Sequence, residues 1–198
     1  MKQSKLTTAI LILIVSARAH GADPQSWSIP DEEREVILLR RTDGAAREGG
    51  RLKLQTRVGW LTFEDRISSD ESHMRYYLAG FIDTPDPHYL VRMTGFETHG
   101  YRLVGKNTGQ TIDLYGIPKF SPDGTRFVEV SLDLEAGHMP NLIRIHRRTR
   151  ENYAVEWEHA FPGLKGPAHP VWLDDSALVF FEVTFDRAPS KLNLIKRY

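Results

Sequence analysis

The sequence predicts an all-β fold, and two features carry that prediction. Apolar residues recur in short runs of four to nine, separated by turn residues, which is typical of strands at regular spacing. Within these runs β-branched and aromatic residues dominate, and residues 51–55 alternate strictly between polar and apolar side chains. The chain has 198 residues and no cysteine, so its core must hold the fold together without disulfides.

The strand-like runs follow one another along most of the chain. We expect strands at 51–55, 60–63, 74–81, 89–96, 101–104, 111–115, 127–132, 141–146, 153–157, 178–185 and 192–195. None of the intervening segments has the composition of an interdomain linker. Residues 20–198 are therefore expected to form a single all-β domain.

A few segments depart from the strand pattern. Ser28, followed by proline and three acidic residues, predicts a short helical turn at 30–34. The Val-Ile-Leu-Leu run within Glu35–Arg40 predicts a strand directly after it. Residues 43–50 are rich in glycine and 161–170 contain three prolines, so both are expected to be irregular.

The first residues have the pattern of a signal peptide. Lys2 and Lys5 form a positive head, residues 6–15 are apolar, and Ala17-Arg18-Ala19 has the small residues that a signal peptidase accepts. An apolar helix of this length spans ~15 Å, about half of the ~30 Å hydrocarbon core of a membrane. We therefore expect residues 1–19 to be a cleaved signal peptide.

The charge of the remaining chain bears on its partners. Removal of residues 1–19 takes away three basic side chains and no acidic one, which leaves 23 basic and 26 acidic side chains and a net charge of −3. A chain of this charge without a polybasic run is a poor ligand for nucleic acid or anionic lipid. No later run is long enough to span a membrane. The expected location is periplasmic or extracellular.

Two sequence elements repeat in the same order. Pro118–Gly124 combines proline, an aromatic residue and a Pro-Asp-Gly turn before a strand, and Pro170–Ser176 repeats this order 52 residues later. A second element, an apolar strand, occurs at Tyr101–Val104, again 41 residues later at Leu142–Ile145, and in short form at Leu192–Ile195. Repeats of 41 and 52 residues are typical of the four-stranded blades of a β-propeller.

The residues 118–128 resemble the Pro-x-aromatic-Ser-Pro-Asp-Gly signature of TolB-type, WD-repeat-like β-propeller blades. The resemblance covers about 89–198 and is strongest at Phe120–Gly124, whereas the second copy has Asp174-Asp175-Ser176 in place of Pro-Asp-Gly. It implies a small or incomplete propeller, and a twisted β-sandwich is the alternative. In such a family the blades are scaffolds for protein or peptide binding, and the signature residues are structural.

The sequence lacks the common catalytic motifs. It has no glycine-rich nucleotide loop, no Gly-x-Ser-x-Gly elbow and no His-Glu-x-x-His. Three carboxylate pairs have spacings compatible with glycoside hydrolysis: Asp133/Glu135, Glu156/Glu158 and Asp174/Asp175. An alternating strand would instead place Trp157 inward and both flanking glutamates in water. Core packing is also the expected role of Trp60 and Trp172.

The loop after the strand at 127–132 is the strongest candidate binding segment. It carries Asp133, Glu135, His138 and Asn141, four side chains with lone pairs within nine residues. Their oxygen atoms could bind Ca²⁺, although the spacing is not that of an EF-hand. The alternative is a connector in which the acidic side chains accept hydrogen bonds from turn amides.

These observations predict an exported, non-enzymatic protein that binds a protein or another macromolecule of the cell envelope. Loops on a rigid β scaffold are where such contacts usually lie. The alternative is a hydrolase whose site is assembled from scattered Asp, Glu and His residues. A cleft with converging carboxylates or histidines would favour the hydrolase.

Overall fold

The chain forms four antiparallel sheets that follow one another in sequence. A computed structural model describes residues 30–150, 152–185 and 189–196. Sheet A has the strand order β1-β2-β3, sheet B β4-β5-β6-β7, sheet C β11-β10-β9-β8 and sheet D β12-β13-β14. Each sheet is thus an antiparallel meander of consecutive strands. The predicted all-β class is confirmed.

The strands have the following bounds. Sheets A and B contain β1 (Ala45–Glu48), β2 (Arg51–Thr56), β3 (Gly59–Glu64), β4 (Met74–Ile82), β5 (His88–Gly95), β6 (His99–Gly105) and β7 (Thr111–Leu114). Sheets C and D contain β8 (Lys119–Phe120), β9 (Arg126–Ser131), β10 (Leu142–Arg148), β11 (Tyr153–Ala160), β12 (Lys165–Trp172), β13 (Ala177–Thr184) and β14 (Pro189–Lys196). Every strand expected between residues 51 and 195 overlaps one of these.

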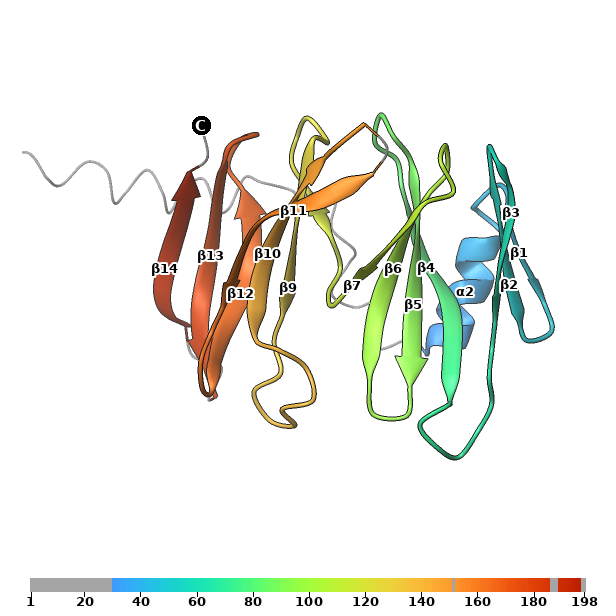
Figure 1. The fold of residues 1–198 in the computed structure, drawn as a ribbon, viewed down its shortest axis with the longest axis horizontal. Helices are drawn as coiled ribbons and strands as arrows, with labels where there is room; N and C mark the ends of the chain where they lie inside the picture. Colours follow the sequence, from blue (N-terminus) through green and yellow to red (C-terminus); the bar gives the residue numbers. More distant parts are fainter. Residues whose placement is uncertain (1–29, 151, 186–188, 197–198) are drawn as a thin grey trace, which may run out of the picture.

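The sheets stack face to face, with sheet A and sheet D at opposite ends (Figure 1). An apolar cluster fills each of the three junctions, and its fully buried members include Leu52 between sheets A and B, Phe127 between B and C, and Ile143 between C and D. Burial of one such side chain stabilises by roughly 1.5–3 kcal/mol before entropy is counted. Repeated burial of this kind lets a chain without cysteine keep its fold.

The predicted strand at Glu35–Arg40 is wrong, because helix α2 continues through it from Asp31 to Leu39. Only part of the apolar run is buried: Leu38 and Leu39 pack against the cluster between sheets A and B, whereas Val36 and Ile37 are exposed. Glu35, although charged, is 5% exposed and accepts hydrogen bonds from Arg47 and from the backbone N–H of Leu78. Three acidic residues in the first turn favour the helix through its dipole.

Two segments expected to be irregular contain strands. The glycines of 43–50 are turn residues on either side of β1: Gly44 and Gly49 have φ values of +82° and +58°. Two of the three prolines of 161–170, Pro167 and Pro170, fall in β12, which is an edge strand of sheet D and so needs hydrogen-bond donors on one side only. The register of β12 shifts between Ala168 and Val171, at the prolines.

The repeated sequence elements occupy equivalent strands. Tyr101–Val104, Leu142–Ile145 and Leu192–Ile195 lie in β6, β10 and β14, each the third strand of its sheet in chain order. Phe120 and Trp172 each end the first strand of a sheet and pack toward the sheet before it. The two strands are in direct contact, because Trp172 Nε1 donates to the carbonyl oxygen of Lys119, the residue before Phe120, at 2.8 Å.

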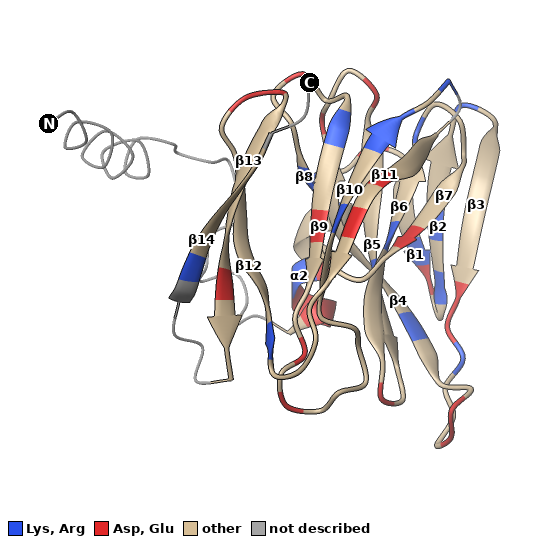
Figure 2. Cartoon of the chain, turned by 60° about the vertical axis from the view of Figure 1, so that its left-hand side comes forward, with Lys and Arg blue, Asp and Glu red and all other residues tan. Residues whose placement is uncertain are grey.

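The predicted signal peptide, residues 1–19, lies outside the described residues. Among the described residues, no helix is long and apolar enough to cross a membrane. Basic and acidic side chains are interspersed over the strands and turns (Figure 2), so no single-signed face stands out in that view.

Candidate functional site

The loop between β9 and β10 is organised by one carboxylate. Asp133 Oδ1 accepts a hydrogen bond from the backbone N–H of Ala136 at 2.9 Å. Its Oδ2 accepts from the N–H groups of His138 and Met139 at 2.8 and 3.0 Å. These bonds favour the ionised form and lower the pKa of Asp133 to about 2. Both oxygens of the strongest candidate cation ligand therefore have backbone partners.

Asn141 closes the same loop at its base. Its Oδ1 accepts from the backbone N–H of Asp133 at 2.6 Å, and its Nδ2 donates to the Asp133 carbonyl oxygen at 3.2 Å. Gly137, with a φ of +69°, allows the chain to reverse between them. Asp133 and Asn141 thus hold the backbone in one shape, as the connector alternative requires.

Glu135 and His138 differ from this pair because both side chains are exposed. His138 lies near Glu97 in the turn between β5 and β6, with 4.0 Å between Nδ1 and Oε2. In the described ranges no group of three or more His, Asp or Glu side chains could hold a metal ion. The structure therefore brings Asp133 and Asn141 together, whereas Glu135 and His138 are exposed at the loop surface.

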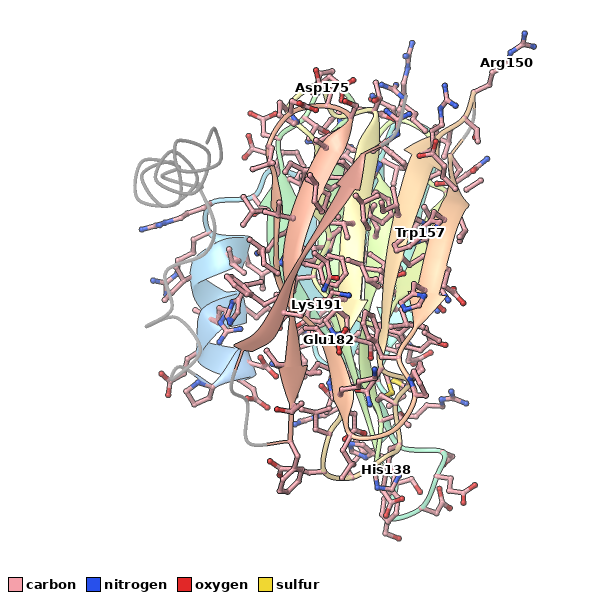
Figure 3. The ribbon with its side chains drawn as sticks, turned by 90° about the vertical axis from the view of Figure 1, so that its left-hand side faces the viewer. His138, Arg150, Trp157, Asp175, Glu182 and Lys191 are labelled. Atoms are coloured by element: carbon pink, nitrogen blue, oxygen red, sulfur yellow. The ribbon has the colours of Figure 1, made fainter. Side chains whose placement is uncertain are left out.

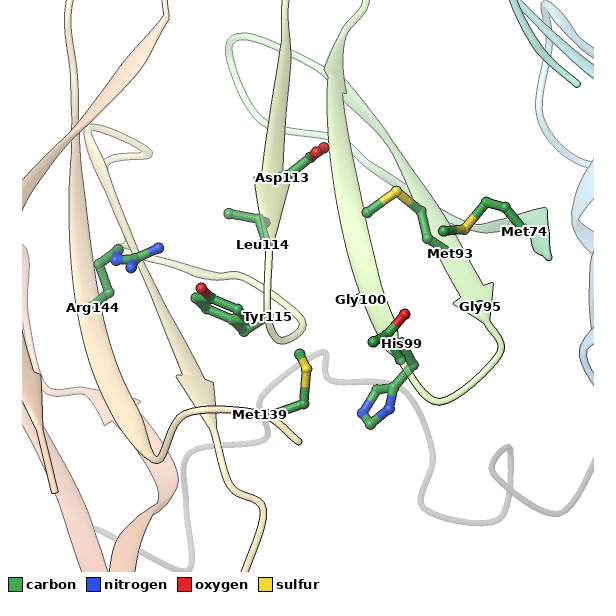
Figure 4. Close-up of a pocket in the computed structure, with 11 residues that line it drawn as sticks. Met74, Met93, Gly95, His99, Gly100, Asp113, Leu114, Tyr115, Met139 and Arg144 are labelled. Atoms are coloured by element: carbon green, nitrogen blue, oxygen red, sulfur yellow. The ribbon is translucent and has the colours of Figure 1, made fainter. Parts of the chain in front are cut away.

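A pocket of about 320 Å³ opens beside this loop, between sheets B and C (Figure 4). Three of the four methionines in the chain line it, namely Met74, Met93 and Met139. Its remaining walls come from β5, β6, β7, β10, the turn between β5 and β6 and the residue after β7. They comprise Gly95, Thr98, His99, Gly100, Asp113, Leu114, Tyr115 and Arg144.

Two of these methionines lie opposite glycines on the neighbouring strand. Met74 pairs with Gly95 across β4 and β5, and Met93 pairs with Gly100 across β5 and β6. A Cβ on Gly95 would lie 3.4 Å from the Met74 methyl carbon, and one on Gly100 would lie 3.6 Å from that of Met93. The flexible thioether side chains therefore lie over bare backbone. Sequence reasoning missed this site, although methionines paired with glycines across adjacent strands were its signal.

The rigid wall of the pocket is built around Arg144. Its guanidinium lies 5.3 Å from the centre of the Tyr115 ring, which is a cation–π distance. It also donates to Glu158 at 2.6 Å and to Glu129 at 3.2 Å. Two carboxylates thus hold the guanidinium of Arg144 in place, and Arg144 lines the pocket.

Glu129 is fully buried behind that wall. Besides Arg144, it accepts from the backbone N–H of Tyr115 at 2.7 Å and contacts His146 Nε2 at 2.9 Å. A buried carboxylate requires such partners, because desolvation would otherwise cost several kcal/mol. The His146 ring stacks on Phe127 with 4.3 Å between ring centres. Glu129 thus links β9 to β10 and to the end of β7, and it positions Tyr115 and Arg144, which both line the pocket.

The carboxylate pairs considered for hydrolysis have other partners in the structure. Glu156 pairs with Arg126 at 2.8 Å, and Glu158 pairs with Arg144. Asp174 accepts from the backbone N–H groups of its own turn, and Asp175 accepts from the N–H of Asp123 at 2.8 Å. None of these four residues lines the methionine pocket. Their contacts are those of structural ion pairs and turn caps.

One expected core tryptophan lies on the surface. Trp60 is 52% exposed on the outer face of sheet A, where the ammonium group of Lys53 lies 5.6 Å from its ring centre. The alternation of β3 places Leu61 and Phe63 against the core and therefore turns Trp60 outward. Trp157 and Trp172 do pack against the cluster between sheets C and D, as expected.

Comparisons with known proteins give no match: no family model, no curated protein and no solved structure matches the chain. The geometry of the chain alone therefore carries the assignment of function.

Proposed function

We propose that the protein is an exported, propeller-like scaffold that binds another protein. The contact surface is the end of sheets B and C that carries the loop 132–141 and the methionine pocket. The observation that carries the proposal is the pocket itself, an open apolar recess beside a loop whose backbone Asp133 and Asn141 hold in place. Fixed loops on a rigid β scaffold are a common setting for protein contacts.

The propeller-like arrangement is supported by the equivalence of the sheets. Sheets B and C are both four-stranded antiparallel meanders, and the repeated sequence elements fall on equivalent strands in sheets B, C and D. Each sheet packs its apolar face on the next, as the blades of a propeller do. Sheets A and D lie at opposite ends of the stack (Figure 1), so the arrangement corresponds to an incomplete propeller rather than a closed one.

The lining of the pocket favours a protein ligand with an apolar side chain. Methionine has three rotatable bonds and a polarisable sulfur, so a methionine surface adapts to apolar side chains of different shape. Tyr115, His99 and Arg144 add aromatic and polar groups to the walls. An apolar centre with polar and aromatic groups around it is the usual composition of a protein contact surface.

Export can be tested by the mass of the mature protein. Expressed with its leader in a bacterium, the protein is expected to begin at His20 or within three residues of it. Intact-mass spectrometry of the soluble, folded protein measures this directly. A protein that keeps Met1 would exclude the signal peptide.

Binding can be tested by affinity capture from a cell-envelope extract. The variant Met139→Lys places a charge in the pocket, and Val58→Lys is the matched control. Val58 is 70% exposed in the turn between β2 and β3, at the opposite end of the sheets (Figure 1). We expect a polypeptide that the wild type and the control retain and that Met139→Lys loses at least ten-fold. Equal capture by all three proteins would show that the pocket is not the contact.

A further inference from the structure

The outer face of sheet D is an apolar surface on the strands that end the stack. Leu178 and Phe180 of β13 point inward and belong to the cluster between sheets C and D. Because side chains alternate along a strand, Val179 and Phe181 point the other way. Their register partners on that outer face are Val171 of β12 and Leu192 and Leu194 of β14.

These outer side chains are only partly covered. Val171, Leu192 and Leu194 are 41%, 44% and 53% exposed, and Val179 and Phe181 lie between them in the middle strand. Figure 3 looks onto this face and shows no described element in front of it. We name these five residues the sheet D patch: Val171, Val179, Phe181, Leu192 and Leu194. A contiguous apolar patch of this kind marks an interaction surface more often than scattered surface leucines do.

The opposite end of the stack has a different surface. The outer face of sheet A carries Arg51 paired with Glu64 and Lys53 paired with Glu48, each at 3.0 Å. Packing the sheet D patch on this face would bury those charges against apolar side chains, at a high desolvation cost. A head-to-tail contact between two copies is therefore unfavourable, and the two ends of one chain are likewise not complementary.

We propose that the sheet D patch is a dimer interface that packs on the same patch of a second copy of this chain. An apolar face is complementary to itself, and a two-fold axis brings each strand of sheet D opposite its counterpart. The contact would repeat the face-to-face packing that the chain uses at its three internal junctions. The two-fold axis closes the assembly at two copies, which leaves the charged face of sheet A in solvent.

The size of the patch predicts a dimer of moderate affinity. Three strands at ~4.8 Å spacing and eight residues at ~3.3 Å give a flat face of roughly 350–400 Å² per copy. This flat area is about half of the accessible surface, about 800 Å², that each partner buries in a stable interface. We therefore expect a reversible monomer–dimer equilibrium with a dissociation constant on the order of 1–100 μM.

Analytical ultracentrifugation of the purified protein over a concentration series tests the proposal. We expect the weight-average mass to rise from monomer to dimer with concentration. Leu194→Asp and Val171→Asp, on opposite edges of the patch, should each weaken dimerisation at least ten-fold. Leu173→Asp is the matched control, because Leu173 is also 53% exposed but lies in the turn between β12 and β13. It should dimerise like the wild type.

Two further readouts keep the test decisive. Thermal melts establish that each variant is folded before its mass is interpreted, and the two patch variants lie on different strands, so one can substitute for the other. Raising the salt concentration should not weaken an apolar dimer, whereas it would weaken one held by ion pairs. A wild type that remains monomeric up to about 0.5 mM, or one whose dimer both patch variants leave unchanged, overturns the proposal.

Discussion

The carboxylate of Asp175 accepts a hydrogen bond from the backbone N–H of Asp123, 52 residues earlier, with 2.8 Å between Oδ1 and N. The two residues belong to the two copies of the repeated turn, in neighbouring sheets C and D. Arg126 and Trp172 add donors to the same junction, to the carbonyl oxygens of Asp175 and Lys119. The two copies of the repeated turn therefore contact each other directly, where the turns of sheets C and D lie side by side.

The first prediction concerns this contact. Asp175→Ala should lower the free energy of unfolding by about 1 kcal/mol, because the N–H of Asp123 loses its acceptor near the surface. Asp175→Asn keeps an oxygen acceptor and should lower it by less. Urea unfolding of both variants measures the difference. Equal losses for the two would mean that the hydrogen bond is not the stabilising contact.

The second prediction concerns the buried Glu129. Glu129→Ala should lower the free energy of unfolding by roughly 3–5 kcal/mol, because it leaves the charge of Arg144 and the N–H of Tyr115 without their buried acceptor. Glu158→Ala removes the other carboxylate that pairs with Arg144. The side chain of Glu158 is 42% exposed. That control should cost less than about 1 kcal/mol. Denaturant unfolding checks both, and similar small losses would contradict the role given to Glu129.

The third prediction concerns the loop 132–141. Asp133→Ala should speed hydrogen exchange at the N–H groups of His138 and Met139, which lose their acceptor, whereas Glu135→Ala should not. The pKa of Asp133 is lowered to about 2 from an ordinary value of 3.8. The bonds of its ionised form are therefore fully present above about pH 3.8 and are lost as the pH falls toward 2.

Protection of these two amides in the wild type should follow that pH window. Exchange measured by nuclear magnetic resonance at neutral pH, for wild type and both variants, is the primary test. Calcium offers a second: a melting temperature that millimolar Ca²⁺ does not raise would remove the metal version of the loop hypothesis. Unchanged exchange in Asp133→Ala would show that the carboxylate does not hold the loop.

The fourth prediction concerns His88, which is 4% exposed between the Phe120 and Tyr153 rings. Burial lowers its pKa below the ordinary value of 6.5, because the charged form is poorly solvated there. The unfolded chain then binds the proton more readily, so stability is retained above about pH 6.5 and declines as the pH falls below it. His88→Gln removes the titrating group and should flatten this decline. Urea unfolding between pH 7 and pH 5 compares the two slopes, and parallel curves would contradict the assignment.

Much of the local structure could be predicted from short sequence patterns. Period-two alternation and β-branched runs located most of the strands, because each strand has one face on a core and one away from it. The turns at Asp123 and Asp174 were recognisable for the same local reason: short acidic side chains accept hydrogen bonds from amides two or three residues on. The helical extension through Glu35 was missed, because its burial depends on Arg47 and Leu78, residues distant in sequence.

The site required the tertiary structure. The loop residues Asp133 and Asn141 were found from composition, but only the folded chain shows that their side chains bond to the loop's own backbone. The methionine pocket was missed, since Met74, Met93 and Met139 come from different strands and a loop and meet only when sheets B and C pack.

The sequence by itself determined the class of fold, most of the strands and the repeat, since all three follow from interactions among near neighbours in the chain. The tertiary structure decided which face of each strand is covered. Trp60 was expected in the core and lies outside, and Leu194 has the same apolar pattern as buried strands but faces away from the stack. The physical reason is that alternation defines two faces, and only the packing of sheets selects which of them leaves water.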